Sequence, residues 1–136
     1  MGQLLSEKTK VIIIEDDESI LNSLKEILMS EGYEVDTATD GEEGIKKCKA
    51  NLFDLALLDI KLPGMNGTKV LEILHEEFPE MIKIMITGYP SLENAVASLK
   101  RGADAYLMKP VNPSSLLKVM NEKLSERSNN RLRRRS

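Results

Sequence analysis

The chain has one cysteine, Cys48, and one histidine, His75, among its 136 residues. A single cysteine excludes an internal disulfide and a multi-cysteine zinc site. No second ligand stands at metal spacing from His75, which is typical of a solvated surface residue. On a helix, Cys48 would share a face with Ile45 and Leu52, as a buried structural thiol does. This use of cysteine favours a reducing compartment.

Long hydrophobic runs are also missing. No stretch approaches the roughly 18 apolar residues needed to cross a bilayer, and residues 1–7 do not join a basic segment to an apolar core, as a secretory signal would. Hydrophobic residues make up 41% of the chain and charged residues 30%, and the length is that of one globular domain. We therefore expect a cytoplasmic domain without membrane contact.

Charge is unevenly distributed along the chain. The net charge is −3, but residues 127–136 hold five arginines and no acid, which leaves a charge of −8 on the remainder. An acidic body argues against direct nucleic-acid binding by the domain itself. It also suggests that negative charge is gathered somewhere to bind a cation.

Apolar runs that alternate with amphipathic segments predict an α/β fold. The expected strands are Val11–Ile14, Tyr33–Ala38, Leu55–Leu58, Ile82–Ile86 and Ala105–Met108. Right-handed crossovers would place helices on both faces of a doubly wound parallel sheet. We therefore predict a flavodoxin-like (βα)5 fold with strand order 2-1-3-4-5.

The segments between the strands carry helix caps and apolar stripes. The first helix is expected to begin near Glu18. The predicted N-terminal caps are Asp40 (with Glu43 completing a capping box) and Asn112 (followed by Pro113). The third helix is expected to follow Asn66 and the fourth to start at Ser91, and the predicted helix ends are Gly32 and Gly102. The predicted apolar faces are Ile20, Leu21, Leu24, Ile27 and Leu28; Val70, Leu71, Leu74 and Phe78; Leu92, Ala95, Val96 and Leu99; and Leu116, Leu117, Met120 and Leu124.

Five polar residues follow four of the predicted strands. Asp16 and Asp17 come after the first, and Asp59, Thr87 and Lys109 come after the third, fourth and fifth. Ligand sites in open α/β sheets lie outside the carboxyl ends of the strands. Three acids, a hydroxyl and an amine should therefore converge on one patch, which suits a divalent cation and a phosphoryl group.

The crowded acids point to magnesium. Two unit charges ~4 Å apart cost about 4 kcal/mol at an effective dielectric of 20, so the cluster must raise a pKa or recruit a cation. Carboxylate oxygens without neighbouring His or Cys ligands favour Mg²⁺ over zinc or copper. We expect Asp17 and Asp59 to bind the ion directly, Asp16 mainly through water, and the backbone carbonyl of Lys61 to be a further ligand.

Asp59 is also the best candidate nucleophile, because a carboxylate can attack phosphorus to give an aspartyl phosphate. Charge in the transition state spreads over the phosphoryl oxygens. Lys109 would supply a compact positive charge and Thr87 a hydroxyl donor. Gly88 would let its backbone N–H approach the phosphoryl group.

Four segments in this order resemble the receiver domain of two-component response regulators. They are Val11–Asp17, Leu57–Gly67, Met85–Gly88 and Gly102–Pro110, and the resemblance covers about residues 9–126. The 2-1-3-4-5 strand order is itself known from receivers, so the fold prediction is not independent of this resemblance.

The resemblance implies a function. Asp59 would accept a phosphoryl group from a sensor histidine kinase or a phosphotransfer protein, and the domain would catalyse only its own phosphorylation and dephosphorylation. Thr87 and Tyr106 would form a switch that changes the partner-binding surface of the last two helices and the last strand. The family also implies a cis Lys109–Pro110 bond, an output domain or target protein, and a possible phosphorylation-dependent homodimer.

Two residues beside the expected phosphoryl group could control its lifetime. Lys61 lies two residues after Asp59, and Tyr89 lies two residues after Thr87. A bulky Tyr89 could shield the acyl phosphate from water. Glu15 extends the acidic pair, with no separate role expected.

Rival functions fit the sequence less well. A flavin carrier of this fold needs a Ser/Thr/Gly-rich phosphate loop where residues 15–18 are acidic, and an aspartate-based phosphatase needs a second acid where Lys61 stands. Residues 64–69 lack the spacing of a P-loop. A phosphorylation-independent interaction module of the same fold stays an alternative.

The expected organisation is an N-terminal extension over residues 1–8, a receiver over 9–126 and a basic tail or start of a linker over 127–136. The tail has the composition of a solvated, disordered end, although a linker or a nucleic-acid or membrane-surface contact also stays open. The sequence identifies neither the kinase nor the downstream target.

Overall fold

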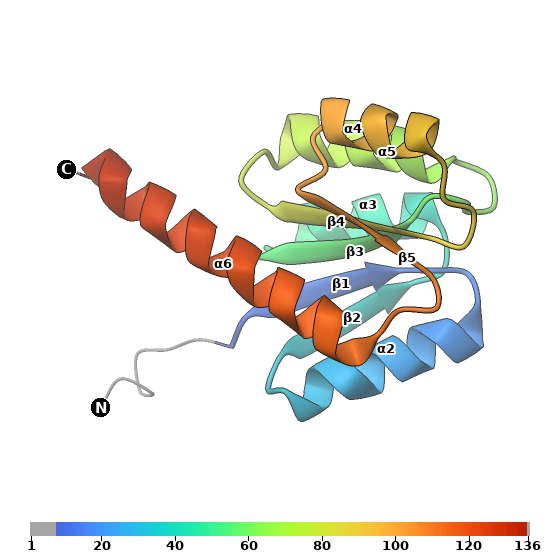
Figure 1. Ribbon diagram of the computed structural model, residues 1–136, viewed down its shortest axis with the longest axis horizontal. Helices are drawn as coiled ribbons and strands as arrows, with labels where there is room; N and C mark the ends of the chain where they lie inside the picture. Colours follow the sequence, from blue (N-terminus) through green and yellow to red (C-terminus); the bar gives the residue numbers. More distant parts are fainter. Residues whose placement is uncertain (1–7, 136) are drawn as a thin grey trace.

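The computed structural model describes residues 8–135 and contains a five-stranded parallel sheet in the order β2-β1-β3-β4-β5 (Figure 1). The strands are β1 (Lys10–Ile14), β2 (Glu34–Ala38), β3 (Leu55–Asp59), β4 (Ile82–Thr87) and β5 (Ala105–Met108). The helices are α2 (Glu18–Ser30), α3 (Gly41–Ala50), α4 (Gly67–Glu77), α5 (Leu92–Lys100) and α6 (Pro113–Arg135). The predicted fold and strand order are confirmed.

Alternating residues of the strands build a core on each face of the sheet. Ile12 and Ile14 of β1 lie in the core with α3 and α4, whereas Val11 and Ile13 lie in the core with α2 and α6. Figure 1 shows α3 and α4 on one side of the sheet and α2 and α6 on the other. Because both faces are covered, β1 and β3 are apolar in almost every position.

The caps predicted at Asp40 and Asn112 are confirmed, and Asn66 and Ser91 are also helix caps. The side chains of Asp40, Asn66, Ser91 and Asn112 each accept a hydrogen bond from a backbone N–H in the first turn of their helix. Glu43 does not bond the cap residue itself, and its carboxylate instead accepts from the N–H of Thr39 at 2.8 Å. Each helix start is therefore encoded locally.

The predicted apolar face of α5 is wrong. Leu92, Val96 and Leu99 are 82%, 42% and 54% exposed, and the buried residue of this helix is Ser98. The helix is short and packs beside the edge strand β5 and against α4. Leu52, expected to be buried beside Cys48, is likewise exposed because α3 ends at Ala50.

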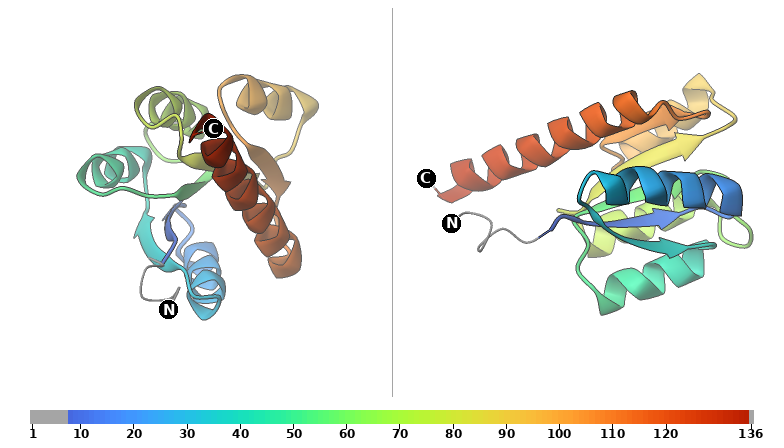
Figure 2. Two further views of the ribbon diagram at one scale, coloured as in Figure 1. Left: turned by 90° about the vertical axis from the view of Figure 1, so that its left-hand side faces the viewer. Right: turned by 90° about the horizontal axis from the view of Figure 1, so that it is seen from below.

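The basic tail is helical, contrary to the expected disordered end. α6 continues to Arg135, and its C-terminal half extends past the sheet (Figure 2). The Arg127 guanidinium donates to the Asp54 carboxylate at 2.8 Å and to the Asp54 carbonyl at 3.1 Å. Arg134 pairs with Glu80 at 3.0 Å. These contacts supply partners that the composition of the tail does not reveal.

None of the helices described over residues 8–135 is both long and apolar enough to span a membrane. α6 is the longest at 23 residues, but its second half is rich in arginine and asparagine.

Candidate functional site

The carboxyl ends of β1, β3, β4 and β5 meet at one edge of the sheet. β1 and β3 pair up to Ile14 and Leu58, β3 and β4 pair at Asp59 and Ile86, and β4 and β5 pair at Thr87. The backbone N–H of Lys109 donates to the carbonyl of Thr87 at 2.8 Å and so continues the last pairing past β5. This register places the predicted residues side by side.

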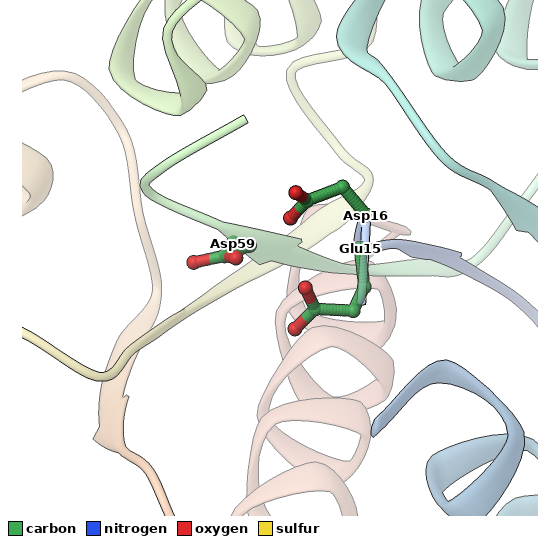
Figure 3. Close-up of side chains that lie close together, drawn as sticks. All are labelled: Glu15, Asp16 and Asp59. Atoms are coloured by element: carbon green, nitrogen blue, oxygen red, sulfur yellow. The ribbon is translucent and has the colours of Figure 1, made fainter. Parts of the chain in front are cut away.

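Three acids converge at this edge, and they are Glu15, Asp16 and Asp59 (Figure 3). One carboxylate oxygen from each lies within 4.8 Å of the others. Glu15 and Asp59 are only 3% and 6% exposed, whereas Asp16 is exposed. All the nearby donors in this group are hard oxygens, so the set fits a magnesium ion.

Asp17 is not part of this group, although we expected it to bind the metal directly. It is the N-terminal cap of α2, and its Oδ1 accepts hydrogen bonds from the N–H groups of Ser19 and Ile20. A helix that begins at Glu18 requires the residue before it for this task. Glu15, to which we gave no role, lies in the group instead.

Lys109 reaches both buried acids. Its Nζ lies 2.6 Å from Oε1 of Glu15 and 3.1 Å from Oδ2 of Asp59. Burial lowers the pKa of Lys109, but its hydrogen bonds to Glu15 and Asp59 outweigh burial, and the pKa is raised overall. The ammonium is therefore charged and fixed beside the expected phosphoryl acceptor.

Burial raises the pKa of Glu15 to about 7, against the opposing effect of its hydrogen bond to Lys109. The Asp59 charge adds to the rise. The group thus holds more negative charge than one lysine can neutralise, which is the condition under which a site recruits a cation.

This pKa makes stability pH-dependent. In the absence of divalent cations, Glu15→Gln should stabilise the domain by about 3 kcal/mol near pH 8 and have little effect near pH 4. The pKa rises from 4.5 to about 7 on folding, so the cost of ionising Glu15 is absent below the lower value and complete above the higher. Urea unfolding in EDTA would measure it. The exposed Glu26→Gln is the matched control, and equal effects of the two variants would contradict the prediction.

The remaining predicted residues surround the acids. Thr87 is 1% exposed, and its Oγ1 accepts from the N–H of Tyr89 at 3.0 Å. A Cβ added to Gly88 would lie 3.7 Å from Cδ of Lys109, so this glycine borders the lysine. The N–H of Lys61 donates to Oδ1 of Asp59 at 3.3 Å, and the metal role expected of its carbonyl stays a prediction.

Tyr106 lies within β5, near the start of the strand and not at its carboxyl end. Its ring packs against the core that contains α3 and α4, and its hydroxyl is buried without a hydrogen-bond partner among the described residues. The Lys109–Pro110 bond is cis, as the resemblance implied.

Glu15 could have been found from the sequence. The predicted start of the first helix at Glu18 already assigns Asp17 to the cap position. Removing Asp17 from the set leaves Glu15 and Asp16 as the adjacent acids that follow the first strand.

Comparison with known proteins gives a consistent result. A family model described as "Response regulator receiver domain" matches residues 11–121. The chain is 36% identical over 108 residues to the transcriptional regulatory protein DltR of Streptococcus agalactiae, and 35% identical over 109 residues to the response regulator ArlR of Staphylococcus aureus. These alignments cover 79% and 80% of this chain but 48% and 49% of the relatives, so the chain spans about half of their length.

The structural comparison extends over more of the chain. A receiver domain protein (CheY-like) from Methanospirillum hungatei JF-1 superposes with a TM-score of 0.89 and 52% sequence identity, over 91% of this chain and 99% of that one. The sequence match includes the strand ends that carry the acids and the lysine. The chain therefore belongs to the response regulator receiver domain family of two-component signalling.

Proposed function

We propose that the domain accepts a phosphoryl group on Asp59 in a Mg²⁺-dependent reaction and that phosphorylation changes its partner-binding surface. The observation that carries this proposal is the contact of Lys109 with Asp59 beside the converging acids Glu15 and Asp16. The domain would catalyse only its own phosphorylation and dephosphorylation.

The acids of the group would hold the metal. Glu15, Asp16 and Asp59 supply carboxylate oxygens, and the carbonyl of Lys61 is a further candidate ligand. Asp17 is left out because its side chain already accepts two backbone N–H groups. When bound, Mg²⁺ would neutralise charge on the phosphoryl oxygens.

The residues of the chain then have separate tasks. An oxygen of Asp59 attacks phosphorus as the bond from phosphorus to the donor breaks, and the phosphoryl group is transferred whole. Lys109, already fixed in place, balances the charge of the transferred group. Gly88 leaves room for a backbone N–H at the phosphoryl oxygens, and Thr87 supplies a hydroxyl.

Thr87 and Tyr106 would transmit the change. The Thr87 hydroxyl can exchange its present bond from the N–H of Tyr89 for one to the phosphoryl group. The buried, unpartnered hydroxyl of Tyr106 marks a ring whose polar end is not fixed by a hydrogen bond among the described residues. Phosphorylation would bias this pair between two arrangements, with a coupling of about 1–3 kcal/mol.

The exposed apolar residues of α5 support a partner surface beside β5. Leu92, Val96 and Leu99 lie on α5, and Met108 at the end of β5 is 60% exposed. Such a group of exposed apolar side chains is typical of an interaction site. We propose that a downstream output domain or target protein, or a second copy of the domain, binds here in the cytoplasm after a histidine kinase or phosphotransfer protein has supplied the phosphoryl group.

Mass spectrometry tests the proposed function. Incubation with acetyl phosphate and Mg²⁺ should add the mass of one phosphoryl group, located on the peptide that contains Asp59, and EDTA should prevent it. An unmodified protein under all conditions would favour a phosphorylation-independent interaction module.

Tyr89 is expected to protect the acyl phosphate. The Lys61 Nζ lies 3.8 Å from the centre of the Tyr89 ring, so the two side chains form a cation–π pair beside the acceptor. The contact between Lys61 and the Tyr89 ring contributes about 0.5–1 kcal/mol. Tyr89→Ala removes this contact and gives water easier access to the acyl phosphate, so the variant should lose its phosphoryl group about two- to fivefold faster. Tyr89→Phe keeps the ring and is the control. An unchanged rate in Tyr89→Ala would reject this role.

A further inference from the structure

The two halves of α6 are held to the domain in different ways. Leu116 and Met120 of the first half are completely buried in the core that contains α2, and Leu124 packs against that core. From residue 125 to residue 134, every residue is exposed except Arg127. Apolar packing therefore ends about one turn before Arg127, although the helix continues past the sheet (Figure 2).

Residues 128–134, which we call the end segment of α6, have a weak helix tendency of their own. Ser128, Asn129 and Asn130 are poorer helix formers than alanine, leucine or lysine. Arg131 has one arginine three residues after it and another four residues before it, and like charges at these spacings repel on a helix. Arginines near a helix C-terminus gain from the helix dipole, but short helical segments without tertiary contacts are marginal in water. The end segment therefore needs a contact with the domain to stay helical.

The inner contact is the one between Arg127 and Asp54. The Arg127 guanidinium donates through Nη2 to Oδ1 of Asp54 at 2.8 Å and through Nη1 to the Asp54 carbonyl at 3.1 Å. The two side chains are 16% and 35% exposed, so water screens this ion pair only in part. The contact lies directly before the end segment and can fix the direction in which the helix leaves the domain.

Asp54 is a firm point of attachment because the sheet holds it from several sides. Its Oδ2 accepts from the backbone N–H of Lys10 at 2.9 Å, and its own N–H donates to the Lys10 carbonyl at 2.8 Å. Its carbonyl also accepts from the N–H of Ile82 at 3.0 Å. Asp54 thus joins the starts of β1, β3 and β4, and Arg127 attaches α6 to all three strands at once.

The outer contact is weaker. Arg134 pairs with Glu80 at 3.0 Å, but the two side chains are 72% and 57% exposed. Ion pairs this open to solvent contribute little to stability, because water screens them and two long side chains must be ordered. Of the two ion pairs that join the second half of α6 to the rest of the described chain, the inner one is therefore decisive.

The inner contact is also incomplete. The Nε of Arg127 is buried and has no hydrogen-bond partner among the described residues. A buried donor without a partner loses its hydration, and opening the contact would restore it. This loss offsets part of what the other two hydrogen bonds contribute, so the closed and open arrangements are closer in free energy than a fully satisfied guanidinium would make them.

We propose that the contact between Arg127 and Asp54 is a latch for the end segment of α6. While the latch is closed, the helix continues through the end segment; when it opens, the end segment loses its helical order and the rest of the domain keeps its fold. The proposal goes beyond the proposed phosphotransfer and does not depend on it, because Asp54 precedes β3 whereas Asp59 ends that strand.

Backbone order parameters from nitrogen NMR relaxation of the whole chain test the latch, without Mg²⁺ or a phosphoryl donor. Arg127→Met removes the guanidinium but keeps a long, helix-favouring side chain. In the wild type, the order parameters of the end segment should be near the value of about 0.85 for rigid backbone, and in Arg127→Met they should fall below about 0.6. A rigid end segment in Arg127→Met, or a flexible one in the wild type, would overturn the proposal.

Arg134→Met is the matched control, because it removes an arginine of the same helix that makes only the exposed contact. We expect it to leave the order parameters of residues 128–132 close to those of the wild type. An equal loss of order in the two variants would assign the hold to the arginines in general and overturn the proposal. A loss of order in Arg127→Met that extends to β1 and β3 would also overturn it, because the domain itself would then have loosened.

Asp54→Asn tests the partner. The asparagine oxygen can still accept from the N–H of Lys10, which turns its NH₂ donors toward the guanidinium. The end segment should lose order as in Arg127→Met, and an unchanged end segment would show that the Asp54 carboxylate does not hold it. Should Asp54→Asn fail to fold, wild type in about 1 M NaCl decides: the exposed pair is screened there and the inner pair much less. Order that persists supports the latch, and order that is lost overturns it.

Discussion

Asp59→Asn should not take up a phosphoryl group from acetyl phosphate at any Mg²⁺ concentration. The amide nitrogen is not a nucleophile and the amide oxygen is a poor one, so the substitution removes the acceptor while keeping the size of the side chain. Lys109 keeps its contact with Glu15, so the variant should still fold. Intact-mass measurement over time gives the result.

Asp17→Asn is the matched control for this experiment. Asparagine is as good a helix cap as aspartate, and Asp17 lies outside the converging acids. We expect it to be phosphorylated nearly as fast as the wild type, whereas Asp16→Asn should be much slower. Slow phosphorylation of Asp17→Asn with normal Asp16→Asn would restore the ligand assignment that the sequence favours. A phosphoryl group on Asp59→Asn would identify a different acceptor.

Gly67→Ala should destabilise the domain by about 3 kcal/mol or more. Gly67 begins α4, and its N–H donates to the carbonyl of Ile60 at 2.8 Å. A Cβ there would lie 2.1 Å from the carbonyl oxygen of Asp59 and 2.6 Å from that of Ile60. Both are backbone atoms, so either the helix or the loop after β3 must move. Urea unfolding would measure the loss.

Two other glycines separate crowding from backbone conformation. Gly88→Ala meets its nearest heavy atom at 3.7 Å, an ordinary contact, and should cost much less. Gly32 has open space around it but a φ of 91°, so Gly32→Ala should cost about 1 kcal/mol through backbone conformation alone. A cost for Gly67→Ala no larger than that of Gly32→Ala would contradict the crowding argument.

The parts of the fold that were predicted correctly depend on local signals. Strand hydrophobicity, the helix caps Asp40 and Asn112, and the strand–helix alternation determine the order of elements, and handedness determines the topology. Asp59 and Lys109 lie in contact, as the sequence predicted, because each stands at the carboxyl end of a strand of the parallel sheet.

The predictions failed where the position of a side chain depends on the exact residue at which a helix starts, or on a contact with a residue far away in the sequence. Three consecutive acids follow β1, and only the exact start of α2 decides that Asp17 caps the helix while Glu15 turns toward Lys109. The helical tail depends on Asp54, which lies 73 positions from Arg127.

The contact between Arg127 and Asp54 holds α6 at a position inside the helix, so a tilt of the helix about this contact would displace its two ends. At ~1.5 Å per residue, its 23 residues span about 35 Å. Arg127 lies about 14 residues, or about 21 Å, from the start of α6, so a tilt of about 5° about this contact displaces the first residue of the helix by about 2 Å. Asp54 immediately precedes β3, the strand that ends in Asp59, so the Arg127–Asp54 contact and the proposed phosphoryl acceptor lie at opposite ends of one short strand.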